Sequence, residues 1–81
     1  MIERNEFREW LTENTELSNR VQGNIVSRVK RADKILEWTG EETYLFFLER
    51  QEAFQQLSYS VKSQLRRAVK YYETFCAYKS K

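Results

Sequence analysis

The longest uninterrupted helical pattern in the chain covers residues 58–79. Apolar residues recur there at steps of three and four, which places them on one stripe of an α-helix. No proline or glycine interrupts the segment, and Ser58 or Ser60 can cap its first turn by accepting a bond from a backbone N–H. We therefore expect the other segments to cover its apolar stripe. The stripe comprises Val61, Leu65, Ala68, Val69, Tyr72, Phe75 and Cys76.

Two more helices are predicted in the first half of the chain. One covers residues 2–13, where apolar residues stand at positions i, i+3 and i+4. The next covers residues 19–38 and has Ser18 as its expected cap. Its apolar stripe comprises Val21, Ile25, Val29, Ala32 and Leu36.

A further helix is predicted over residues 41–57, with a break near residues 51–52. Gly40 can end the preceding helix in a left-handed turn. Thr39 and Glu42 have the spacing of a capping box for the helix that follows. With this segment the pattern predicts four helices in all. The core positions expected here are Tyr44, Phe47, Leu48, Phe54 and Leu57.

One glycine stands inside the second predicted helix. Gly23 falls on its outer face, where glycine costs about 1 kcal/mol relative to alanine. Two readings stay open. Either the helix begins only at Asn24, or the glycine allows a ligand such as a phosphate to approach the backbone closely.

The composition favours an all-α fold in a single domain covering residues 1–81. The chain has no proline and only two glycines, fewer than strand-and-turn proteins need. Its one cysteine cannot form an internal disulfide, and no stretch resembles a signal peptide or a membrane span. We expect a cytoplasmic protein without membrane contact.

Charge alternates along the chain, although the net charge is only +2. Residues 1–19 and 39–57 each carry a net charge of −3, whereas residues 20–38 carry +3 and residues 58–81 carry +5. The second and fourth predicted helices are thus basic, and outer faces lying side by side would form one surface for a polyanion such as DNA. Ser27 and Ser63 on these faces can donate to phosphate. The candidate DNA-binding residues are Arg20, Arg28, Lys30, Arg31, Lys34, Lys62, Arg66, Arg67 and Lys70.

Plainer readings of the charged residues stay open. The cations can form a solvated surface or pair with the acidic helices, and exposed ion pairs stabilise by only about 0–1 kcal/mol. Glu9 and Glu13 are four residues apart, as are Asp33 and Glu37, but nothing in the sequence completes a metal or acid–base site around them. The chain also has no histidine. We therefore expect no catalytic residue, no metal and no cofactor.

The remaining apolar residues are interpreted mainly as core. Cys76 lies on the apolar stripe with no histidine to activate it, so a core thiol is expected. Both tryptophans are expected in the core or at its edge. Residues 44–48 are five large apolar side chains in a row, which cannot all face inward on one helix. Leu45 or Phe46 is therefore expected to be exposed and to contact a protein partner.

Residues 6–20 and the last predicted helix follow the order of elements found in a known type of domain. The former read EFREWLTENTELSNR, an aromatic-rich helix followed by a loop that ends in Leu17-Ser18. A basic amphipathic helix comes next, and the last helix runs into KYYETF with Tyr72 and Phe75 as an aromatic pair. This order resembles the N-terminal core-binding domain of phage integrases and other tyrosine recombinases. The resemblance covers about residues 6–78 and rests mainly on core spacing and one cap.

The resemblance implies a small four-helix, SAM-like orthogonal bundle. In that family the domain clamps one side of duplex DNA, and its second and fourth helices approach the major groove and the backbone. These 81 residues do not contain the recombinase catalytic domain, so no catalytic role carries over to Tyr71, Tyr72 or Tyr78. Gly23 also departs from what the family leads us to expect in the second helix.

Two functions are expected from these observations. The first is a non-enzymatic DNA-binding domain, associated with a phage or mobile element, that contacts duplex DNA mainly through the backbone. It would stand alone or be a fragment of a larger integrase. The alternative is a small protein-interaction module, such as a phage-borne inhibitor or regulator of a host protein.

Overall fold

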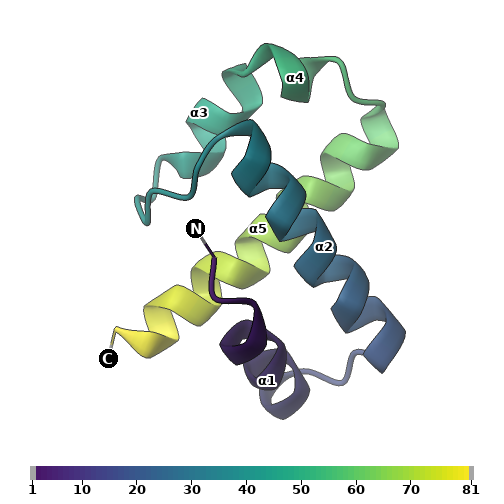
Figure 1. Ribbon diagram of the computed structural model, residues 1–81, viewed down its shortest axis with the longest axis vertical. Coiled ribbons are helices and arrows are strands. Elements are labelled where there is room, and N and C mark those ends of the chain that lie inside the picture. The colour runs from purple at the N-terminus through teal and green to yellow at the C-terminus, as the bar shows by residue number, and fades with distance from the viewer. Residues whose placement is uncertain (1, 81) are drawn as a thin grey trace.

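The computed structural model describes residues 2–80, which form five α-helices and no β-strand (Figure 1). The expectation of an all-α fold is confirmed for these residues. The third predicted helix is split at Gln51, where the sequence indicated a break. The helices are α1 (Arg4–Asn14), α2 (Asn19–Ile35), α3 (Tyr44–Arg50), α4 (Glu52–Gln55) and α5 (Tyr59–Lys79).

The helices α2 and α5 cross at the centre of the molecule and make its most extensive helix–helix contact (Figure 1). Figure 1 looks along the shortest axis, over which the Cα atoms extend 16 Å. Two packed helices, with Cα cylinders about 2.3 Å in radius and axes about 8–10 Å apart, fill that thickness. The fold is therefore two helix layers deep at the crossing, with α2 in one layer and α5 in the other.

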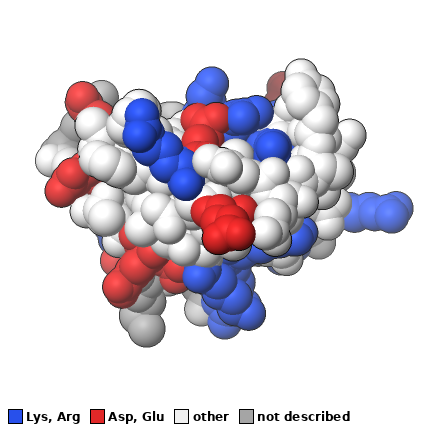
Figure 2. All heavy atoms as spheres, turned by 90° about the horizontal axis from the view of Figure 1, so that it is seen from above, with Lys and Arg blue, Asp and Glu red and all other residues white. Residues whose placement is uncertain are grey.

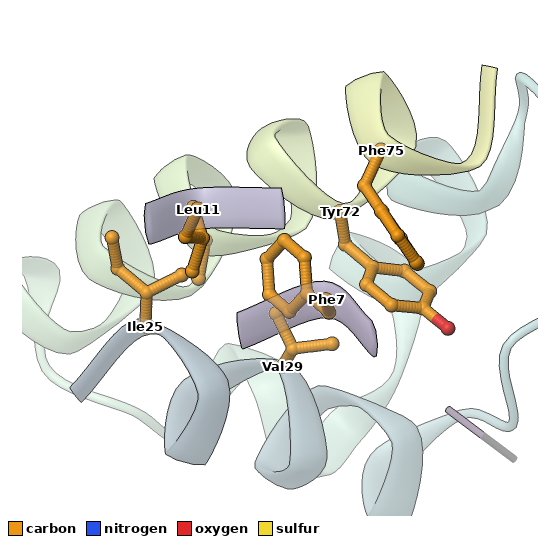
Figure 3. Close-up of a cluster of buried hydrophobic side chains, with 7 residues drawn as sticks. Phe7, Leu11, Ile25, Val29, Tyr72 and Phe75 are labelled. Carbon is orange, nitrogen blue, oxygen red and sulfur yellow. The ribbon is translucent and has the colours of Figure 1, made fainter. Parts of the chain in front are cut away.

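Two clusters of buried side chains hold α5 against the other helices. The first joins α1, α2 and the C-terminal half of α5, and Figure 3 shows most of it. Its members are Phe7, Leu11, Ile25, Val29, Ala68, Tyr72 and Phe75. The second joins the end of α2 to α3, α4 and the N-terminal half of α5. Its members are Ala32, Tyr44, Leu48, Phe54, Leu65 and Val69.

Serine side chains cap both long helices. The Ser18 hydroxyl accepts a hydrogen bond from the Val21 backbone N–H at 3.3 Å, and the Ser58 hydroxyl accepts one from the Val61 N–H at 3.3 Å. The cap predicted at Ser18 is confirmed. Of the two candidates for α5, Ser58 is the cap and Ser60 lies in the first turn. Each such cap contributes about 1 kcal/mol.

The end of α2 comes three residues earlier than predicted. Leu36 is extended, and Gly40, with φ 79°, lies in the following loop instead of ending the helix. The Tyr44 hydroxyl donates to the Leu36 carbonyl oxygen at 2.5 Å and so satisfies the end of α2. The early turn also places Trp38 between two rings, with centroid distances of 4.7 Å to Tyr44 and 5.0 Å to Tyr72. Packing at a distance in sequence thus ends the helix.

The capping box expected before the third helix does not form. The Thr39 hydroxyl accepts from the Glu41 N–H at 3.3 Å, which closes a local turn, and α3 begins only at Tyr44. Phe47 is half exposed instead of buried. The reason is that α3 has only seven residues, and Tyr44 and Leu48 already occupy its inward stripe.

Three contacts join residues 3–6 to the C-terminal part of α5. The Glu3 backbone N–H donates to the Tyr72 hydroxyl at 2.9 Å. The Lys79 ammonium pairs with the Glu3 carboxylate and, at 3.0 Å, with that of Glu6. Hydrogen bonds to these two carboxylates raise the pKa of Lys79.

Candidate nucleic-acid interface

The outer side of α2 carries a row of basic and hydroxyl side chains. The inward stripe includes Ile25, and at 100° per residue Lys34 lies about 180° around the helix from it. We call this outer side the α2 face, which comprises Arg20, Ser27, Lys30, Arg31 and Lys34. The last four of these residues line a shallow hollow of about 180 Å³.

The cations of the α2 face have no acidic partner among residues 2–80. Ion pairs in this part of the chain are Arg66 with Glu49 and Lys79 with Glu3 and Glu6. One of the plainer readings of the sequence was salt bridging to the acidic helices. It does not account for the cations of the α2 face. Its positive charge is thus not neutralised by an ion pair within residues 2–80.

The outer side of α5 carries a second basic patch. Arg67 and Lys70 are exposed and lie about 200° and 140° around the helix from the buried Leu65. The Arg67 guanidinium lies 5.9 Å from the Tyr71 ring centroid. Arg67, Lys70, Tyr71 and Thr74 line a hollow of about 250 Å³. We call this side the α5 face, which comprises Ser63, Arg67, Lys70 and Thr74.

The α2 face and the α5 face point in opposite directions. The two helices bury their apolar stripes against each other across the two layers, so the sides that carry the cations face outward from opposite layers. Figure 2 views the layers edge-on and shows Lys and Arg side chains toward both its upper and its lower border, with acidic side chains among and between them. The expectation of one continuous cationic surface is therefore wrong, because the sides that would form it are separated by the packed stripes.

Three of the nine predicted DNA-binding residues lie outside both faces. Arg28 and Lys62 are half-buried at the edges of their helices. Arg66 donates to the Glu49 carboxylate at 2.7 Å, and its guanidinium lies 5.6 Å from the Phe54 ring centroid. Arg66 thus ties α5 to α3 and α4. The other six predicted cations lie on the two faces.

Gly23 lies inside α2, which begins at Asn19, so the reading in which the helix starts at Asn24 is wrong. A Cβ at Gly23 would meet the Arg8 guanidinium at 3.5 Å, which is an ordinary van der Waals distance, and Arg8 also donates to the Asn19 side-chain oxygen at 2.8 Å. The Arg8 side chain of α1 thus lies against this glycine, but the packing of α1 on α2 does not require glycine here.

Burial is the main cause of the pKa shifts of titratable groups near the core. It raises the pKa of the Cys76 thiol, which was expected in the core and is half-buried against the first cluster. It also raises the pKa of Tyr44 to about 12, with a smaller contribution from the charge of Asp33. Across residues 2–80, no three or more His, Cys, Asp or Glu side chains are grouped to hold a metal ion.

Glu73 provides a pH-dependent test of this burial. Its pKa is raised chiefly by burial, with Lys70 opposing the shift and Glu42 adding to it. A raised folded-state pKa means that the ionised carboxylate costs stability above that pKa, and the cost fades as pH falls and the folded chain binds the proton. Glu73→Gln is therefore expected to raise the free energy of unfolding at about pH 7, with a gain that shrinks toward about pH 4. Urea denaturation at several pH values measures this gain, with Glu16→Gln at an exposed position as the control. A gain that does not change with pH would contradict burial as the cause of the raised pKa.

Two phenylalanines stand exposed on α3. Phe46 is 54% exposed and Phe47 50%, and their ring centroids lie 5.3 Å apart. The Arg50 guanidinium lies 4.4 Å from the Phe46 centroid. The exposure expected at Leu45 or Phe46 is confirmed for Phe46, whereas Leu45 is half-buried. The core position predicted for Phe47 is wrong, although the break expected near residues 51–52 already shortened the helix that could bury it.

Comparison of the chain with protein-family models found no match. Comparisons with curated proteins and with solved structures found none either. The resemblance to recombinase core-binding domains therefore stays a prediction from the sequence. Within residues 2–80, no helix has the length and apolar character needed to cross a lipid bilayer.

Proposed function

We propose that the protein is a non-enzymatic DNA-binding domain of a phage or mobile element, which contacts duplex DNA mainly through the α2 face. The observation that carries the proposal is the row of α2 cations without an ion-pair partner among residues 2–80. Lys and Arg side chains neutralise phosphates and release counterions, and the Ser27 hydroxyl can donate to a phosphate oxygen. Contacts of this kind position a protein on DNA without reading its sequence.

The resemblance to core-binding domains supports the same proposal. We infer that the five helices correspond to the four-helix, SAM-like bundle of that family, with α3 and α4 as two parts of its third helix. The second helix of that bundle is one of the two that approach DNA, and here it is α2. The protein would act in the cytoplasm.

A salt titration tests the proposal. Fluorescence anisotropy with a labelled duplex of arbitrary sequence is expected to show binding at low ionic strength. Contact with three to four phosphates predicts that log K falls with log salt at a slope of about −3 to −4, since each neutralised phosphate contributes about −0.9. A slope near zero, or no binding at low salt, would refute phosphate contact.

The exposed Phe46–Phe47 pair favours the second candidate function, a protein-interaction module that inhibits or regulates a host protein. Adjacent exposed rings next to a stacked Arg50 are typical of an interface core, where aromatic residues and arginine are enriched. The two functions are separated by replacing both phenylalanines with serine. That change leaves DNA affinity intact if the α2 face is the functional surface.

A further inference from the structure

The α5 face has the same chemistry as the α2 face. Arg67 and Lys70 are exposed, and neither forms an ion pair with another residue of the described chain. The Arg67 guanidinium lies 5.9 Å from the Tyr71 ring centroid, and its N–H groups can donate to phosphate oxygens. The α5 face is therefore a second candidate surface for a polyanion.

One duplex cannot occupy both faces at once. The faces point outward from opposite layers of a molecule that extends only 16 Å between its outermost Cα atoms in that direction. Duplex DNA has a persistence length of about 50 nm, and bending a site of 20–30 bp by 40–90° already costs about 1–6 kcal/mol. A segment that passed from one face to the other would need a much sharper bend.

An acidic groove on α1 lies outside both faces. Glu6, Glu9 and Glu13 line this groove of about 320 Å³ together with Trp10, Tyr78 and Lys79, and Lys79 pairs with Glu6. The two remaining carboxylates, of Glu9 and Glu13, disfavour a polyanion at this groove.

We propose that each molecule bridges two DNA segments, holding one duplex on the α2 face and a second on the α5 face. The inference rests on the proposed function of the α2 face. It adds that a single chain carries two opposed sites, so bridging needs no dimer.

Co-capture of two duplexes tests this proposal. An unlabelled duplex fixed to beads is mixed with a fluorescent duplex and the purified full chain at low ionic strength. The protein is expected to bring the fluorescent duplex to the beads. Co-capture should fall again when the duplex in solution is in large excess over the protein. DNA from solution then occupies both faces of each molecule, so no face remains for the duplex on the beads.

The variant Arg67→Glu, Lys70→Glu is expected to lose co-capture by about tenfold or more while it still binds a single duplex through the α2 face. The matched control is Arg4→Glu, which is compared with Arg67→Glu alone, because it makes the same charge change at an exposed position outside α2 and α5. This control should bridge like the wild type. Circular dichroism checks that each variant folds, and Arg67→Gln, Lys70→Gln replaces the first variant if it does not.

Three outcomes decide the matter. Equal co-capture by the α5-face variant and the wild type would overturn bridging by opposed faces, since the link would then run through protein–protein contact. Single-duplex binding by the wild type without co-capture at any ratio would also overturn it, while leaving the proposed function intact. Absence of single-duplex binding would overturn both.

Discussion

Replacing Phe7 by alanine is expected to cause a large loss in the free energy of unfolding. Phe7 is fully buried, and its ring centroid lies 5.0 Å from that of Tyr72 and 5.4 Å from that of Phe75, so it joins α1 to α5 (Figure 3). Truncating a buried phenylalanine costs about 3–5 kcal/mol. A chain of 81 residues has a total stability of only about 4–12 kcal/mol. The single change thus removes a large share of the stability.

Urea denaturation followed by circular dichroism measures this loss. Phe46→Ala is the matched control, because it removes the same atoms from a ring that is 54% exposed. Its effect is expected to stay within about 0.5 kcal/mol. Similar losses for the two variants would contradict the assignment of Phe7 to the buried cluster.

Reversing two cations on each basic face is expected to abolish duplex binding. The variant combines Lys30→Glu, Lys34→Glu, Arg67→Glu and Lys70→Glu. Each face then repels phosphate instead of attracting it, so the affinity should fall by about two orders of magnitude or more at low salt. None of the four side chains belongs to a buried cluster, so the fold should survive.

Fluorescence anisotropy measures the loss, and the two pairs are also measured separately. The α2 pair is expected to account for most of it. Arg4→Glu, at an exposed position of α1, makes half the charge change of either pair and should leave the affinity nearly unchanged. Wild-type affinity in the fourfold variant would show that DNA does not contact these faces.

Features that depend on neighbouring residues could be predicted from the sequence. A cap at Ser18 needs only a hydroxyl and the N–H three residues on, and the break at Gln51 follows from the local loss of apolar periodicity. The apolar stripe of α5 is likewise a property of one helix, and five of its seven members are buried. All three predictions are confirmed.

Features that depend on distant residues could not be predicted in this way. The end of α2 is fixed by the Tyr44 hydroxyl and by the position of Trp38, and both reflect how α3 packs. The pairing of Arg66 with Glu49 joins residues 17 positions apart. A helical wheel also gives the basic side of each helix but not the direction in which it points after packing. For that reason the two basic sides were expected together and are found apart.

The contacts of Glu3 with Tyr72 and Lys79 hold residues 3 and 79 within reach of a short peptide linker. A gene in which that linker joins residue 79 to residue 3 and the chain is opened between residues 36 and 43 would keep every helix whole. The same proximity would allow residues 3–79 to be inserted into a surface loop of another protein, since the two joints would lie close together.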